Sequence, residues 1–136
     1  MLTTPTELLA ALGAAASGLL FPSESDYPLT PYRWVGTDGA EPSPAALIQA
    51  EGRKADTPIE TLTVRALFEP LFVLQADATE EEKANVARYR ALVDLLEAEL
   101  SDLRVYRVGA VEIDVYVLGR HPSGEWLGLK TRVIET

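Results

Sequence analysis

The fold is decided by the stretch VEIDVYVLGRHPSGEWLGLKTRVIET, residues 111–136. Its first seven residues place valine or isoleucine at every second position, a period of two that marks a β-strand with one strongly apolar face. Residues His121–Gly124 then turn the chain, and Trp126–Ile134 form the returning strand. Because the strand pattern continues almost to Thr136, we expect a sheet to hold the end of the sequence rigidly.

Toward the N-terminus, two capping patterns predict helices. Thr4–Glu7 and Thr79–Glu82 both place a threonine three residues before a glutamate, the pattern of a capping box. They open helices predicted over residues 4–17 and 80–100, and apolar residues on one side of each helix allow it to dock on a sheet. Shorter elements are predicted between the two helices: strands at Tyr32–Val35 and Ile59–Leu62, and short helices over Ser43–Glu51 and Thr63–Phe68.

The length and the order of these elements indicate the fold class. The 136 residues match the commonest size of a domain, so we expect one domain over residues 1–136. Helices that precede a C-terminal β-meander are typical of the α+β class, with helices packed on a largely antiparallel sheet.

The composition is acidic. The chain has 12 Lys and Arg against 21 Asp and Glu, which gives a formal net charge of −9. This charge repels nucleic acid and anionic membranes and favours a basic partner. Because of this charge we do not expect nucleic acid as a partner. No apolar run approaches the roughly 20 residues that span a bilayer, so we do not expect a membrane as a partner either. The absence of cysteine excludes disulfides and thiolate chemistry and fits an intracellular protein.

No set of side chains typical of an enzyme stands out. His121 lies beside a proline in the predicted turn, and without cysteine it cannot complete the usual nucleophilic or zinc sites, so we expect a solvated turn residue. Residues Gly36–Gly39 lack the lysine and the strand and helix context of a phosphate-binding loop. Glu112 and Asp114 share one strand face, but such paired acids usually mark a solvated face. The sequence predicts a protein that is not an enzyme, with no cofactor and no metal of its own.

One predicted loop carries two acidic residues beside two serines. Residues Leu19–Pro28 combine two prolines with the pairs Ser23–Glu24 and Ser25–Asp26, a composition typical of turns rather than of regular pairing. The simplest interpretation is that Ser23 or Ser25 bonds the local backbone while the acids keep the turn soluble. The pattern alone gives this loop no further function.

The same loop, the Trp34 that follows it, and the segments Val105–Gly119 and Val133–Thr136 closely resemble the nuclease A inhibitor family. The likeness spans nearly the whole chain, and the middle matches weakly. Members of this family are α/β/α sandwiches that bind and block a sugar-nonspecific DNA/RNA endonuclease, an enzyme with a histidine base and one divalent metal ion. The resemblance therefore implies an α/β/α sandwich, with a metal-dependent nuclease as its protein partner.

Residue by residue, the resemblance implies a narrow site. Glu24 matches the loop glutamate that enters the nuclease cleft, and Thr136 matches the terminal threonine that reaches toward the metal ion of the nuclease. Before the long helix the sequence departs from the family, because Asp77 and its neighbours stand where the family has an exposed aromatic residue; Asp77 is a further candidate contact. The residues that flank the two central ones are Ser23, Ser25, Asp26 and Glu135.

The physical basis for inhibition fits the composition. A nuclease holds a polyanion in a basic cleft around a metal ion, and an acidic protein can occupy that cleft by imitating the phosphates. The resemblance, with the absence of a signal peptide, implies a cytoplasmic inhibitor, and we expect it to be monomeric when free. The departure around Asp77 leaves one alternative open, an acidic protein-binding module of the same fold with a non-nuclease partner.

Overall fold

The computed structural model describes residues 4–36 and 41–136, so most of the predicted Gly36–Gly39 connection lies outside the described residues. The described elements alternate short strands and helices before a long C-terminal meander. In chain order they are α1 (Pro5–Ala16), β1 (Leu20–Phe21), β2 (Tyr27–Pro28), β3 (Thr30–Trp34), α2 (Pro44–Ala50), β4 (Ile59–Leu62), α3 (Val64–Phe68), the 3₁₀ helix η2 (Glu69–Phe72), α4 (Glu80–Glu99), β5 (Ser101–Val108), β6 (Glu112–Arg120) and β7 (Trp126–Ile134).

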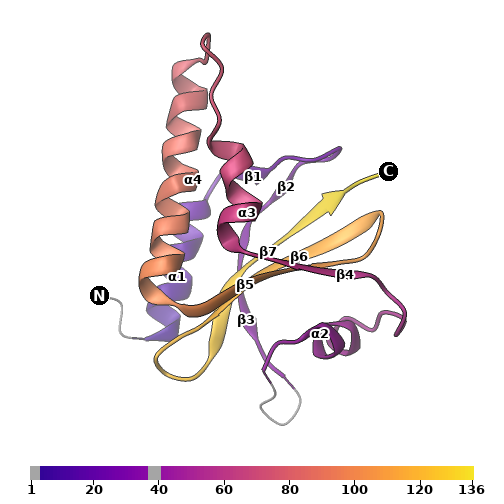
Figure 1. Ribbon diagram of the computed structural model, residues 1–136. Coiled ribbons are helices and arrows are strands. Elements are labelled where there is room, and N and C mark those ends of the chain that lie inside the picture. Colours follow the sequence, from indigo (N-terminus) through magenta and orange to yellow (C-terminus); the bar gives the residue numbers. More distant parts are fainter. Residues whose placement is uncertain (1–3, 37–40) are drawn as a thin grey trace.

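The main sheet has five strands in the order β3-β7-β6-β5-β4, and every neighbouring pair is antiparallel. Strands β5, β6 and β7 form the predicted C-terminal meander (Figure 1). Val117 at the centre of β6 lies opposite Val105 of β5 and Leu129 of β7. The predicted α+β class is therefore confirmed, and β6, which contains the alternating residues 112–117, lies at the middle of the sheet.

Helices cover both faces of this sheet. On one face, Ile113 and Val115 of β6 belong to a core that also contains Leu12 of α1, Phe68 of α3 and Leu96 of α4. Figure 1 shows α1, α3 and α4 together on that side of the sheet and α2 apart from them. The core of the opposite face is a smaller cluster that contains α2, β3 and the alternate residues of the meander: Trp34, Leu47, Tyr106, Val108, Tyr116 and Leu118. Helices therefore lie on both sides of the sheet, and one of these two outer layers is a single short helix.

Local sequence explains where the helices begin and end. The Thr4 hydroxyl accepts a hydrogen bond from the Glu7 amide at 3.1 Å, and the capping box of Thr79 and Glu82 is complete in both directions. Gly18 follows α1 with φ of +78°, a conformation that favours glycine and stops the helix. The predicted boundaries of α1 and α4 are thus confirmed to within about one residue, the usual variation between assignments.

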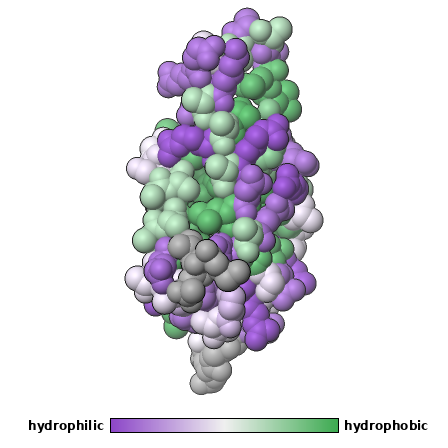
Figure 2. Space-filling view, turned by 90° about the vertical axis from the view of Figure 1, so that its left-hand side faces the viewer, coloured by the Kyte–Doolittle hydropathy of each residue, from purple (hydrophilic) through white to green (hydrophobic). Residues whose placement is uncertain are grey.

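Helix α4 also fixes the segment that leads into the acidic loop. Arg88 donates hydrogen bonds to the carbonyl oxygens of Ala15 and Ser17, at 3.0 and 2.6 Å, and the Tyr89 hydroxyl donates to the carbonyl oxygen of Leu20. Figure 2 views the molecule from the side on which α1 and α4 lie, and hydrophilic residues gather at its upper end. One face of α4 therefore contacts the segment that precedes the acidic loop, and the opposite face is exposed to solvent.

Three sequence-based expectations need correction. The Leu19–Pro28 segment is not free of regular pairing, because β1 and β2 form a two-stranded antiparallel sheet. His121 does lie in the turn between β6 and β7, but it is not solvated: it is 2% exposed, and its Nδ1 accepts a hydrogen bond from the Ser123 amide at 3.0 Å. Asp114 does not share the solvated environment of Glu112, since it is only 4% exposed.

Candidate functional site

The acidic loop between β1 and β2 meets the end of β7. The Ser23 hydroxyl accepts a hydrogen bond from the Ile134 amide at 3.1 Å, and the Glu24 amide donates to the Ile134 carbonyl oxygen at 3.4 Å. These contacts join segments that are more than a hundred residues apart in the sequence. We call residues 23–26 together with residues 135–136 the acidic edge. The predicted residues Ser23, Glu24, Ser25, Asp26, Glu135 and Thr136 are therefore brought into one place.

Glu24 and Thr136 form the central contact of the acidic edge. The Thr136 hydroxyl donates to Glu24 Oε1 at 2.6 Å, and the Thr136 amide donates to Glu24 Oε2 at 2.5 Å. Both residues are exposed. The side-chain bond and then the backbone bond from Thr136 lower the pKa of Glu24 below its usual 4.5, because both donors favour the ionised carboxylate. Glu24 therefore carries a full negative charge at neutral pH, and no basic side chain supplies these bonds.

The serines of the loop have different roles. The Ser23 hydroxyl donates to the Ser25 carbonyl oxygen at 2.6 Å, while the Ser23 amide donates to Asp26 Oδ1 at 3.3 Å. Ser25 takes part in these bonds through its backbone. The sequence interpretation that a loop serine bonds the local backbone thus holds for Ser23, whose hydroxyl in addition reaches β7.

Glu135 is held from the sheet by a residue that the sequence reasoning missed. Arg107 of β5 bonds both carboxylate oxygens of Glu135 through Nη2, one of them at 2.7 Å, and its Nη1 lies 3.4 Å from Glu60 Oε1. The Glu135 amide also donates to the Val111 carbonyl oxygen at 3.0 Å. Arg107 therefore holds the side chain of Glu135, and the bond to Val111 holds its backbone, directly before Thr136. Nothing in the local sequence marks Arg107, since an arginine on an alternating strand is common.

Asp77 does not join this cluster. It is exposed and lies in the segment between η2 and α4. Figure 1 shows that segment at the upper tip of the molecule, whereas the β1–β2 hairpin and the end of β7 lie lower, on the other side of α3. Two apolar side chains of the same segment, Val73 and Leu74, are 72% and 41% exposed.

A second polar cluster lies on the sheet face covered by α2. Asp114 accepts hydrogen bonds from Arg53 Nη2 at 2.8 Å and from Arg132 Nε at 3.2 Å. The charge of Asp114 and then its hydrogen bond raise the pKa of Arg132. Here the carboxylate is paired with two guanidinium groups and shielded from solvent. Asp114 and Glu112 thus do not form an acid pair of the kind that glycoside hydrolysis uses.

Residues 4–36 and 41–136 were compared with the requirements of a metal site and of a membrane-spanning helix. No group of three or more His, Cys, Asp or Glu side chains among them could hold a metal ion. None of their helices combines the length and the apolar character that crossing a membrane requires.

The fold and the acidic edge define an acidic α+β protein that presents fixed carboxylate and hydroxyl oxygens on its surface. A model of the nuclease A inhibitor-like protein family matches residues 6–136, nearly the whole chain. The chain belongs to this family. The chain matches none of the curated proteins with which it was compared. The family likeness predicted from the loop and the C-terminal segments is thereby confirmed.

Proposed function

We propose that this protein inhibits a metal-dependent, sugar-nonspecific endonuclease by placing its acidic edge in the active-site cleft of that enzyme. Membership of the inhibitor-like family supports a nuclease as partner. The observation that carries the proposal is the Glu24–Thr136 contact, in which uncharged donors hold an exposed carboxylate in one orientation. A carboxylate fixed in this way keeps its charge for a partner and loses little conformational entropy when it binds.

Glu24 and Thr136 then have different roles in the complex. The Glu24 carboxylate takes the position of a substrate phosphate in the basic cleft. The Thr136 hydroxyl uses its proton in the bond to Glu24, which leaves the lone pairs of its oxygen free to approach the metal ion. Oxygen atoms are the ligands that Mg²⁺ prefers, and Mg²⁺ commonly keeps several waters, one of which the hydroxyl replaces or contacts. The metal ion belongs to the nuclease, and the inhibitor performs no chemistry.

The net charge of the whole protein affects the rate at which it associates with the nuclease. The net charge of −9 speeds association with a basic cleft, and this effect weakens as salt screens it. Asp77 stands apart from the acidic edge, and we propose it as a peripheral contact that acts mainly on the association rate.

The test is a titration of the protein into such an endonuclease from the same organism, with plasmid cleavage followed at fixed Mg²⁺ and low salt. We expect stoichiometric loss of cleavage with the wild-type protein. Glu24→Gln should weaken inhibition by roughly 30-fold and Thr136→Val by roughly tenfold, the range of central interface residues. The matched control is Glu81→Gln, which removes the same charge from an exposed position on α4 and should change inhibition by less than about twofold.

Two results would contradict the proposal at different levels. Absence of inhibition by a large excess of wild-type protein would exclude the nuclease as partner. Inhibition that survives unchanged in both Glu24→Gln and Thr136→Val would keep the nuclease but exclude the acidic edge as the inhibitory site.

The alternative function is an acidic protein-binding module of the same fold with a non-nuclease partner. The segment that contains Asp77 favours it, because Val73 and Leu74 expose aliphatic side chains there and no aromatic residue lies between η2 and α4. Aromatic residues are frequent anchors of tight interfaces, so a different anchor suits a different partner. The titration separates the two functions, since the alternative predicts no inhibition at any excess.

A further inference from the structure

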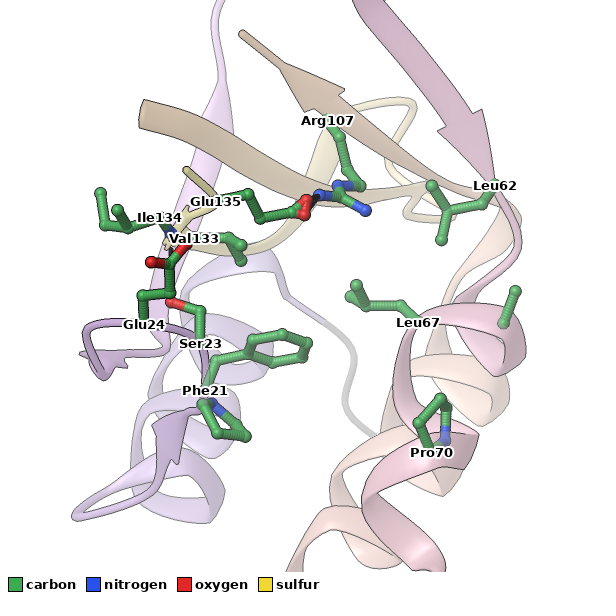
Figure 3. Close-up of a pocket in the computed structure, with 12 residues that line it drawn as sticks. Phe21, Ser23, Glu24, Leu62, Leu67, Pro70, Arg107, Val133, Ile134 and Glu135 are labelled. Atoms are coloured by element: carbon green, nitrogen blue, oxygen red, sulfur yellow. Dashed lines mark hydrogen bonds and ion pairs between the residues drawn. The ribbon is translucent and has the colours of Figure 1, made fainter. Parts of the chain in front are cut away.

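A groove of about 440 Å³ lies directly beside the acidic edge. One wall is formed by the loop and the end of β7, the other by β4, α3 and the start of η2. Figure 3 shows Phe21 and Val133 on one side, Leu67 and Pro70 on the other, and the paired Arg107 and Glu135 at one end. The walls are therefore mostly apolar, and the polar groups gather where the groove meets the acidic edge.

The groove and the acidic edge share residues, so one partner covers both. Ser23, Glu24 and Glu135 belong to the acidic edge and also line the groove. A protein surface that contacts the Glu24–Thr136 pair thus lies over the mouth of the groove. This continuity makes the nuclease itself the candidate occupant, and the inference rests on the function proposed above.

The charges at the mouth select the kind of side chain. Glu24 and Glu135 are both exposed. Arg107 is the one basic residue of the groove lining in the described part of the chain, and its guanidinium is already shared between Glu135 and Glu60. Glu60 and Glu135 share the guanidinium of Arg107, and Glu24 adds a third carboxylate whose hydrogen bonds come from the uncharged Thr136, so negative charge is in excess. A purely apolar side chain would cover these carboxylates without offering them a partner, which costs free energy.

We propose that the groove accepts a lysine or arginine side chain of the nuclease. Its aliphatic stem lies between Phe21 and Leu67, and its cationic head reaches the carboxylates of Glu24 and Glu135. Long basic side chains commonly bury their methylene groups on apolar surface while the charged end stays at a polar rim. Each carboxylate oxygen has a second lone pair, so the bonds from Thr136 and Arg107 do not exclude this cation.

The test uses three substitutions at one position of the groove wall. Ala66 lines the groove from α3, is exposed and has no polar side-chain atom. Methionine, lysine and glutamate are all good helix formers and similar in length, so Ala66→Met, Ala66→Lys and Ala66→Glu fill the groove with different charges. Ala87→Met, Ala87→Lys and Ala87→Glu place the same set on an exposed alanine of α4 and serve as matched controls. The measured quantity is the dissociation constant with the nuclease.

A basic occupant predicts one order of effects. Ala66→Met should weaken binding by about tenfold because it occupies the space, and Ala66→Lys by about 100-fold because it also repels the cation. Ala66→Glu should lose less than Ala66→Met because its charge attracts the cation. The Ala87 variants should stay within about threefold of wild type, which is the effect of net charge alone.

The failures are distinguishable. If the wild-type protein does not bind the nuclease, the proposed function fails before the groove is tested. If the wild-type protein inhibits and all three Ala66 variants bind like their Ala87 controls, the groove is empty in the complex and the inference is overturned. Equal losses in the three Ala66 variants would mean that the occupant is apolar, which also overturns the assignment of a basic side chain.

Discussion

Glu24 and Asp114 have the same chemistry in two opposite surroundings. Both oxygens of each carboxylate accept a hydrogen bond. The donors to Glu24 are the uncharged hydroxyl and amide of Thr136, and Glu24 is exposed. The donors to Asp114 are the guanidinium groups of two arginines, and Asp114 is 4% exposed. The Glu24 carboxylate is a charge at the surface that no basic side chain pairs, and the charge of the Asp114 carboxylate is balanced by two guanidinium groups inside the fold.

The difference shows how an acidic chain divides its carboxylates between binding and stability. A buried carboxylate cannot reach a partner, and its removal leaves paired cations without a counter-charge. An exposed carboxylate contributes little to stability, but neutral donors that hold it still prepare it for an interface. Glu24 should therefore matter for binding and little for folding, whereas Asp114 should matter for folding and little for binding.

The largest effect is expected on stability at Asp114. Asp114→Ala should lower the free energy of unfolding by about 3 kcal/mol, the lower end for a broken buried ion pair, because Arg53 and Arg132 are partly exposed and water compensates them in part. Chemical denaturation measures this change. The control is Glu112→Ala, two residues earlier on the same strand but exposed, with an expected change within about 0.5 kcal/mol. Equal destabilisation by the two variants would remove the distinction between the sites.

The second effect concerns the coupling of Glu24 to Thr136 in binding. Because both donors of Thr136 bond Glu24, each substitution disturbs the contact that the other residue makes. We expect the loss of affinity in the double variant Glu24→Gln/Thr136→Val to be smaller than the product of the single losses by about fivefold. In the control cycle, Glu24→Gln with the distant Asp77→Asn should combine to within about twofold of the product. A multiplicative result for both pairs would mean that Glu24 and Thr136 act independently.

A smaller effect should separate the two loop serines. Ser23→Ala removes the hydroxyl that accepts from the Ile134 amide, so the loop loses one of its attachments to β7. We expect about a fivefold loss of affinity and faster hydrogen exchange at the Ile134 amide. Ser25→Ala is the matched control, because Ser25 contributes its backbone, and it should change neither quantity by more than about twofold. If the two variants behave alike, the Ser23 bond does not position the loop.

Local patterns were sufficient to predict most of the elements and part of the site, but not the pairing of β1 with β2. The capping threonines Thr4 and Thr79 begin helices where the sequence places them, and the alternation from residue 111 marks the central strand. These signals are local, because caps and periodicity depend on neighbouring residues. The convergence of Glu24 with Thr136 came instead from the family resemblance, since no local pattern relates two residues 112 positions apart.

The errors in expected burial share one physical cause. An alternating strand was expected to have a single buried face, but α2 covers the other face, so Tyr116 and Leu118 are also buried. The arginines that neutralise Asp114 come from the segment after α2 and from β7, and sequence alone does not bring them together. His121 was expected to be solvated because it lies in a turn, yet it is 2% exposed. Burial depends on long-range packing, and only the assembled layers determine it.

The smallest effect is a shift in the titration of Glu24. Its pKa lies below the usual 4.5, mainly because of the Thr136 hydroxyl and then the Thr136 amide. Thr136→Val removes the hydroxyl but keeps the amide, so the pKa should rise and remain below 4.5. A ¹³C NMR titration of the Glu24 carboxyl measures this shift, and an unchanged curve would contradict the hydrogen bond in solution.

The sign of that shift also determines how the binding data are interpreted. A lowered carboxyl pKa contributes stability at pH values above the unfolded pKa, and this contribution disappears as the pH falls through the folded pKa, here below about 4.5. At neutral pH, Glu24 is therefore ionised both in the wild-type protein and in Thr136→Val. Any loss of inhibition by Thr136→Val at neutral pH then reports the missing hydroxyl and the freed orientation of Glu24, and not a change in its charge.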